Sequence, residues 1–157
     1  KKLKKQEARI LEAGRSCVNK NYRDGRIIRL LWRGLSEYIV QKNIDYIIGC
    51  ASFQGNNIEE VSERLSYLHH YHLAPKKIRS QPLRQKSIHW AMTPKKKIKQ
   101  FEVFKKLPPL IKAYLRVGSW IGEGAIIDKE FNTIDVCIIL KKENILSKYL
   151  NMSEKKS

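Results

Sequence analysis

Two short apolar runs, joined by a polar turn and a long amphipathic segment, constrain the fold of this chain most strongly. Arg9 to Val18 is the first run, interrupted by Gly14, and we expect it to form a strand. Asn19 to Gly25 has the composition of a turn. Asp45 to Phe53 is short and apolar enough for a second, buried strand. The pattern predicts two strands of one sheet, joined by a right-handed crossover helix.

The segment between the two runs has the spacing of a helix with one apolar face. Asp24 is the expected N-cap, and Arg33 can pair with Glu37 one turn later. The apolar residues recur at intervals of three and four, which predicts that they face the sheet: Ile27, Leu30, Leu31, Leu35, Tyr38 and Ile39.

Further elements are expected after the second run. They are a helix from Asn56 or Asn57 to His72, a short helix begun by Pro108 and Pro109, and a hairpin of Ala125 to Ile127 with Thr133 to Leu140. Helices and strands in this order predict an α/β fold, or α+β by some schemes, with a mixed sheet.

The net charge of +17 is concentrated in one segment. Residues Lys76 to Lys106 hold eleven lysines and arginines against Glu102 alone, contain no glycine, and lie among all five prolines. We expect a long, mostly extended connection with short helical turns. Its possible partners are nucleic acid, an anionic membrane surface or an acidic protein. The structural alternative is a solvated loop without a partner.

Two features near the first strand suggest binding of a phosphate and of an amine. The glycine-containing turn feeds a helix N-terminus, where free N–H groups bind phosphate, and Arg23 and Arg26 flank it. Glu12 and Arg15 lie three residues apart, and a carboxylate in a cleft can act as a general base or bind an amine. The alternatives are a purely structural turn and an ion pair at the edge of the sheet.

The histidines and cysteines do not form a metal-binding pattern. His69, His70 and His72 do not share one helix face, and no nearby carboxylate completes a ligand set. The three cysteines lie far apart and include no CxxC pair. We therefore expect no metal and no disulfide framework, with Cys17 and Cys50 as small core residues rather than nucleophiles.

Six blocks, in order, resemble the bacterial ornithine N-acyltransferases of ornithine-lipid synthesis, which belong to the GNAT superfamily. The blocks are EAGRSCV (12–18), YRDG (22–25), LLWRGL (30–35), GCASFQG (49–55), LPPLIKAYLRVG (107–118) and FNTIDV (131–136). The resemblance covers nearly the whole chain, and six ordered blocks are far more specific than any single one.

The resemblance implies a GNAT-like fold, with a mixed sheet whose central strands splay apart. It implies transfer of a fatty acyl group, typically 3-hydroxylated, from acyl carrier protein to the α-amine of L-ornithine, giving lyso-ornithine lipid. No cofactor is bound permanently, since the acyl-phosphopantetheine arm of the carrier is a co-substrate. The arm would lie between the splayed strands with its phosphate near Tyr22 to Arg26, and the amine would attack directly.

The resemblance also implies roles for individual residues. Glu12, Arg15 and Ser16 would be the catalytic group, with Glu12 binding or deprotonating the amine and Arg15 ordering the site; the Glu-x-x-Arg pattern also resembles that of acyl-homoserine-lactone synthases. N–H groups near Cys17 and Val18 would polarise the thioester carbonyl. The acyl-donor residues would be Cys17, Val18, Tyr22, Arg23, Gly25, Arg26, Ser52 and Phe53. Carrier or membrane docking would use Lys95, Lys96, Lys97 and Lys99.

Only Lys1 to Ile10 precede the strand that is central in a GNAT domain, which suggests a C-terminal fragment without the N-terminal strands. We expect residues 1–152 to be part of one domain, with the basic insert at 75–107 and a frayed tail at 153–157. No apolar run reaches the roughly 18 residues of a membrane span, so we expect a cytoplasmic protein, or one peripheral to the inner membrane face. The alternatives are a basic module that binds nucleic acid or membrane, and an inactive acyltransferase remnant.

Overall fold

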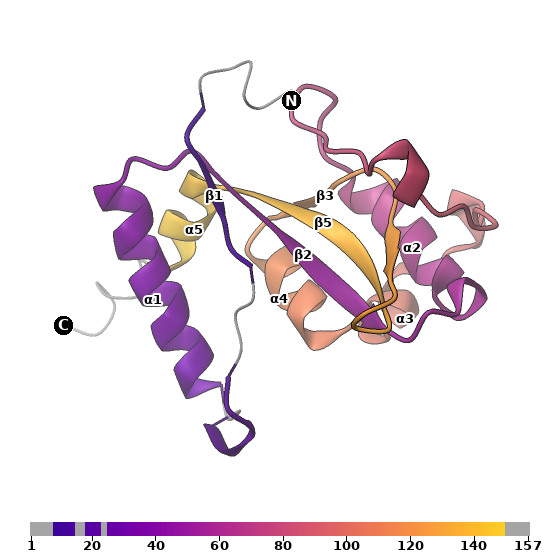
Figure 1. Cartoon of the computed structure of the whole chain (residues 1–157), viewed down its shortest axis with the longest axis horizontal. Helices are drawn as coiled ribbons and strands as arrows, with labels where there is room; N and C mark the ends of the chain where they lie inside the picture. The colour runs from indigo at the N-terminus through magenta and orange to yellow at the C-terminus, as the bar shows by residue number, and fades with distance from the viewer. Residues whose placement is uncertain (1–7, 15–17, 23–24, 150–157) are drawn as a thin grey trace.

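The computed structural model describes residues 8–14, 18–22 and 25–149 (Figure 1). In chain order the elements are β1 (Ile10–Glu12), the 3₁₀ turn η2 (Lys20–Tyr22), α1 (Arg26–Gln41), β2 (Tyr46–Gln54), α2 (Ile58–His72), the 3₁₀ turns η3 (Arg84–Lys86) and η4 (Lys95–Lys97), α3 (Gln100–Lys105), α4 (Pro109–Arg116), β3 (Trp120–Ile121), β4 (Ile126–Asp128), β5 (Thr133–Lys141) and α5 (Lys142–Tyr149).

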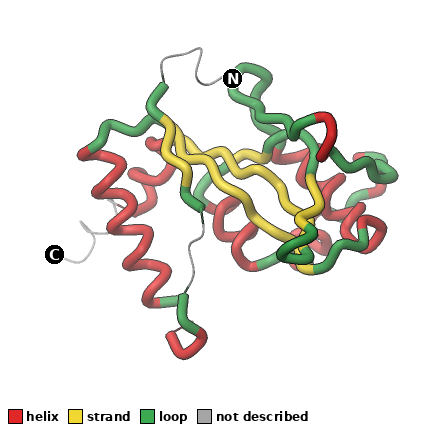
Figure 2. The backbone as a smooth tube through the Cα atoms, in the orientation of Figure 1, coloured by secondary structure: helices red, strands yellow, loops and turns green. Residues whose placement is uncertain are grey.

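The strands form one mixed sheet in the order β1-β2-β5-β3, with β4 also paired to β5 (Figure 2). β1 runs parallel to β2, and the other pairs are antiparallel. The predicted mixed sheet, the strand-helix-strand unit and the β4–β5 hairpin are confirmed, but β1 spans only Ile10–Glu12 where a strand was expected from Arg9 to Val18. The short strand β3 and the helix α5 were not anticipated from the sequence.

Local chemistry explains where the first two helices begin. Gly25 is the N-cap of α1, with φ at 88°, a left-handed conformation that favours glycine, so the prediction of Asp24 as the cap is wrong. The Arg33–Glu37 pair is confirmed, with 3.4 Å between Nε and Oε1. Asn57 is the N-cap of α2, because its side chain accepts a hydrogen bond from the Glu59 N–H at 3.1 Å.

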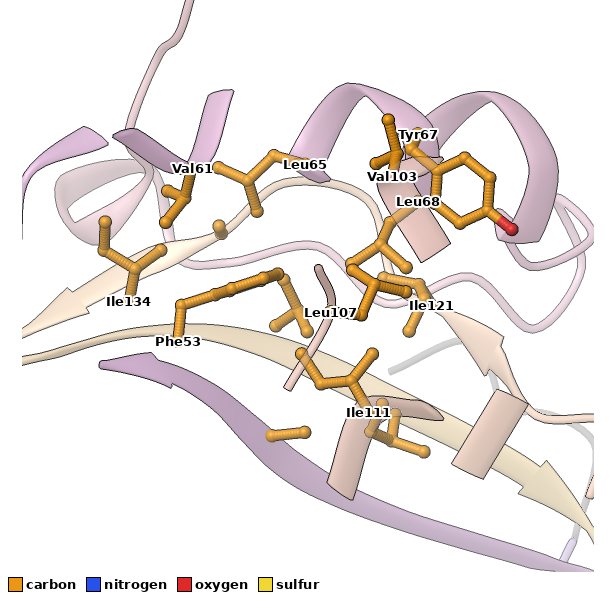
Figure 3. Packing of buried hydrophobic residues seen from close by; sticks show 14 of the residues in the cluster. Phe53, Val61, Leu65, Tyr67, Leu68, Val103, Leu107, Ile111, Ile121 and Ile134 are labelled. Atoms are coloured by element: carbon orange, nitrogen blue, oxygen red, sulfur yellow. The ribbon is translucent and has the colours of Figure 1, made fainter. Parts of the chain in front are cut away.

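The two faces of the sheet are covered differently. On one face, which we call the helix face, alternate residues of β2 such as Ile47, Ala51 and Phe53 are buried against side chains from α1, α2, α4 and α5. Figure 3 shows Phe53 in the cluster that α2 and α4 cover. On the opposite face, Ile48 packs with Ala74 and Ile78, in the segment that follows α2. The opposite face is therefore covered by a short segment of chain instead of a layer of helices.

The basic insert is mostly extended with short helical turns, as predicted, but it is not simply a solvated loop. Ile98, Val103 and Leu107 are buried in the main hydrophobic cluster. Trp90 Nε1 donates to Ser66 Oγ at 3.2 Å, and the Thr93 N–H donates to the same oxygen at 3.0 Å. The insert therefore packs along α2 on one side and presents its lysines on the other.

Candidate functional site

The pairing of β1 with β2 ends abruptly. Glu12 opposite Ile48 is the last pair in register, and the Ala13 N–H donates to the Ile48 carbonyl at 2.8 Å. A Cβ at Gly49 would lie only 2.7 Å from the Ala13 carbonyl oxygen, so the chain of β1 leaves the sheet by passing close over a glycine. β2 continues to Gln54 while β1 diverges from it, as Figure 1 shows. The expected splay of the two strands is confirmed.

A cleft of about 820 Å³ lies at this splay. Its walls are largely apolar and include Leu11, Leu30, Leu31, Leu35, Tyr38 and Tyr114. The lining also includes Glu12, Cys50 and Ser52, which by strand alternation belong to the opposite face of the sheet. The cleft therefore reaches both faces, because the two strands part and leave an opening between them.

The side of α1 that faces the cleft differs from the prediction. Trp32, Ser36 and Ile39 are buried, whereas Leu30 is 61% exposed and Leu31 and Tyr38 are also exposed. The expectation that these three exposed residues pack on the sheet is wrong. An apolar helix face looks the same in a sequence whether it meets a core or an open cleft, so periodicity could not separate the two.

Glu12 is exposed at the opening, on the face of the sheet opposite the helices. Its Oε1 lies 3.6 Å from where a Cβ of Gly14 would be, so its carboxylate extends along the strand toward the splay. The structure thus places Glu12 at the cleft, and its catalytic role stays a prediction. The other two predicted catalytic residues, Arg15 and Ser16, lie outside the described residues.

The predicted acyl-donor residues divide into four groups. Val18 and Ser52 line the cleft, while Tyr22, Gly25 and Arg26 lie at the turn and the N-terminus of α1. Cys17 and Arg23 lie outside the described residues. Phe53 is only 1% exposed, inside the helix-face core (Figure 3), so its side chain does not reach the cleft. Its neighbour Ser52 points to the other face, since side chains alternate along a strand.

Cys50 is exposed in the cleft, so the expectation that it is a core residue is wrong. Partial burial, followed by the negative charge of Asp135 and the neighbouring Cys137 and then of Glu12 and Asp128, raises the pKa of its thiol. A raised pKa keeps the thiol protonated and weakens it as a nucleophile. The expectation that Cys50 is not a nucleophile is consistent with this environment.

The predicted docking lysines are exposed. Lys95, Lys96 and Lys97 form η4 at the surface, and Lys95 Nζ lies 4.9 Å from the centroid of the Tyr71 ring. Of the aromatic residues of the insert that could stack on nucleic-acid bases, Trp90 and Phe104 pack against the core, and Phe101 is 69% exposed. The insert thus presents cations with few free aromatic rings.

The histidines of α2 take part in structural contacts. His70 Nε2 lies 2.9 Å from the Thr93 carbonyl oxygen, and His72 Nε2 lies 3.0 Å from the Tyr67 hydroxyl. Burial lowers the pKa of His69 and of His72. Within the described ranges, no three histidine, cysteine or acidic side chains gather as a metal site. No helix in this part of the chain is long and apolar enough to cross a membrane.

The known proteins that this chain resembles are acyltransferases. The acetyltransferase (GNAT) domain family matches residues 1–33. L-ornithine N(alpha)-acyltransferases are 36% identical in Rhodobacter capsulatus, over 90% of this chain and 54% of that protein, and 41% identical in Brucella abortus, over 96% of this chain and 53% of that protein. The one from Agrobacterium fabrum is 38% identical over 91% of this chain and 49% of its own length. The chain spans about half the length of these curated relatives. No solved structure matches it.

Proposed function

Because the chain is 36% and 41% identical to two L-ornithine N(alpha)-acyltransferases and its first 33 residues match the GNAT domain family, we propose that its protein is such an enzyme. It transfers a fatty acyl group, typically 3-hydroxylated, from acyl carrier protein to the α-amine of L-ornithine. The product is lyso-ornithine lipid, made in the cytoplasm or at the inner membrane face. The observation that carries the proposal is the apolar cleft that opens through the splayed strands beside Glu12.

The cleft suits the acyl-phosphopantetheine arm in three ways. Leu30, Leu31 and Tyr38 offer an apolar wall to a fatty chain. Beyond Gly49, the edge of β2 has no partner strand among the described residues, so its backbone can hydrogen-bond the amides of an extended arm. The N-terminus of α1 at Gly25 offers N–H groups and a partial positive charge to the phosphate.

The chemical step needs a deprotonated amine and a polarised thioester. We assign Glu12 to accept the proton of the acceptor's α-ammonium group. The free amine then attacks the carbonyl carbon, a C–N bond forms, the C–S bond breaks, and the carrier thiol leaves with a proton. Arg15 and Ser16, which follow Glu12 closely in sequence, are proposed to order the site, with backbone N–H groups near Cys17 and Val18 at the carbonyl oxygen.

Purified protein incubated with 3-hydroxyacyl-acyl carrier protein and L-ornithine should release the carrier thiol and form N-acylornithine, detected by mass spectrometry. The expected rate is at least tenfold above that of the two substrates without protein, since the site positions both reactants. The absence of product from any acyl-carrier donor would contradict the proposal. Tight RNA binding that weakens steeply with salt, without product, would favour the basic-module alternative instead.

We further propose that η4 docks the acidic carrier protein. Replacing Lys95, Lys96 and Lys97 together by glutamate should raise the apparent KM for the carrier on the order of tenfold, because exposed charges at an interface each contribute only a fraction of a kcal/mol. The expected change in kcat is small, since these lysines lie outside the cleft. Steady-state kinetics with varied carrier concentration measure both values.

The matched control replaces the same three lysines by arginine, which keeps the charge and should keep the KM. If the glutamate variant retains the normal KM but loses its binding to vesicles of anionic lipid, then η4 contacts the membrane surface and not the carrier.

A further inference from the structure

A second, smaller cavity lies against the sheet next to the cleft. Its volume is about 150 Å³, enough for several water molecules or the end of an alkylammonium chain. Ser80, Gln81 and Pro82, which follow α2, form one wall, and Asp135 and Cys137 of β5 form another. Cys50 lines both this cavity and the cleft. The two spaces therefore meet at one residue, on the face of the sheet where Glu12 lies.

The Ser80 wall is held firmly in place. The Glu123 N–H donates to the Ser80 carbonyl at 2.8 Å, and Gln81 Nε2 donates to Glu123 Oε2 at 2.8 Å. Arg79 forms an ion pair with the same carboxylate at 3.8 Å. Gly122 lets the Ser80 side chain lie directly against the backbone, because any Cβ at Gly122 would collide with Ser80 Oγ. These contacts therefore fix the shape of this wall of the cavity.

The acidic groups around the cavity differ in what they already bind. Glu123 is engaged by Arg79 and Gln81, and Asp128 Oδ1 caps the β4–β5 turn by accepting from the N–H groups of the two residues at 130 and 131. Asp135 Oδ1 accepts only the Thr133 hydroxyl, at 2.9 Å, among the described residues. Asp135 therefore retains a carboxylate oxygen for a ligand, in a protein whose net charge is +17.

A buried hydroxyl that has only a weak partner lines the same cavity as Asp135. Ser80 Oγ lines the cavity wall, is buried, and makes no regular hydrogen bond to the described part of the chain. Its polar neighbour is the Cys137 thiol, a weak hydrogen-bonding group. A buried hydroxyl with so weak a partner would gain a stronger hydrogen bond from a charged ligand in the cavity.

Resting on the function proposed above, we propose that Asp135, with the Ser80 hydroxyl, binds the side-chain ammonium group of the diamino acid acceptor and so selects it over neutral amino acids. A cation is favoured here because a carboxylate supplies a charge-assisted hydrogen bond. The Ser80 hydroxyl, which is buried against Gly122, can turn about its Cα–Cβ bond and accept a second hydrogen bond from the same ammonium group, which has three donors.

Glu12 and Asp135 lie on the same face of the sheet with their backbones roughly 16 Å apart, so their side chains must extend toward each other to hold the two amines of one acceptor. Glu12 is opposite Ile48, and Asp135 is opposite Ser52, so their backbones are four residues apart along the strands, roughly 13 Å, and two strand spacings apart, roughly 10 Å. One amine cannot touch both groups. A diamino acid lying across Cys50 can place its α-amine toward Glu12 and its side-chain ammonium toward Asp135.

The test compares L-ornithine with L-norvaline, which has the same carbon chain without the second amine. In the acylation assay, Asp135→Asn should lower kcat/KM for ornithine at least tenfold and leave the value for norvaline unchanged. Ser80→Ala should lower the ornithine value about threefold, as expected for one lost hydrogen bond. Normal turnover of norvaline also shows that each variant is folded.

Asp128→Asn is the matched control, because it removes a nearby charge while the asparagine oxygen can still cap the turn, and it should keep the preference for ornithine. A normal preference for ornithine in Asp135→Asn would overturn the inference. Calorimetric titration with ornithine separates the two proposals: binding that weakens tenfold in Asp135→Asn supports this site even if no acyl transfer occurs, and unchanged binding refutes it.

Discussion

Replacing Glu12 by glutamine should lower kcat for ornithine acylation by about 100-fold or more, the size of effect that general base catalysis contributes. Glutamine keeps the shape of the side chain but cannot take a proton from the ammonium group. The residual activity of the variant should rise steeply with pH, because only acceptor that has lost its proton in solution can then react. Steady-state rates across a pH series measure both effects.

The acyl-carrier KM and the thermal midpoint should stay unchanged in this variant, since Glu12 is exposed and carries no core contact. Glu130→Gln, at the exposed turn after β4, is the matched control and should behave as the native protein. A turnover within threefold of normal in Glu12→Gln would mean that another group activates the amine.

A large side chain at Gly34 should close the donor cleft. Gly34 lies within α1 and lines the cleft, and a Cβ placed there meets no atom within 4 Å, so the space is open. Gly34→Trp should therefore fill the position where the acyl arm is proposed to lie, and lower kcat/KM for the acyl donor by at least about 100-fold, the loss that misplacement of a reactant can cause. Activity assays together with thermal unfolding measure the result.

Gly34→Ala is the matched control. Alanine adds one methyl group, leaves the cleft open, and should raise the free energy of unfolding by roughly 0.5–1 kcal/mol, because glycine is a poor residue within a helix. If Gly34→Trp is folded and acylates ornithine normally, the cleft does not hold the donor. If it loses activity together with its thermal midpoint, then Gly34→Leu, a smaller side chain, decides between blockage and misfolding.

Most secondary structure could be predicted from the sequence because its causes are local. The apolar spacing of α1 and α2, the Asn57 cap and the prolines before α4 act within a few residues. β3 is only two residues long and exists because it pairs with β5, so no local pattern marks it. The apolar periodicity of α5 is also weak, so the sequence does not mark this helix, which packs against α1.

The candidate site could be predicted in part. Glu12 and Ser52 were found through residue chemistry and family resemblance, and both lie at the cleft. Phe53 was predicted together with its neighbour Ser52, but consecutive residues of a strand face opposite sides of the sheet, and the Phe53 side chain lies in the core. Asp135, the residue that we propose binds the acceptor, was not predicted. A single acidic residue in an apolar strand does not stand out in the sequence. Its position becomes informative only when β1 and β5 pair with β2 and place Glu12 and Asp135, 123 residues apart, on the same face of the sheet.

The sequence by itself determined the resemblance to ornithine N-acyltransferases, the order of the main helices and strands, and the basic segment, since these depend on residue types and spacings along the chain. Only the tertiary structure decided which apolar face of α1 meets solvent, that the cleft opens onto both faces of the sheet, and that Asp135 and Ser80 share a cavity. These features arise where β1 parts from β2 and where strands distant in sequence pair. Such pairings depend on how the whole chain packs, which no local pattern encodes.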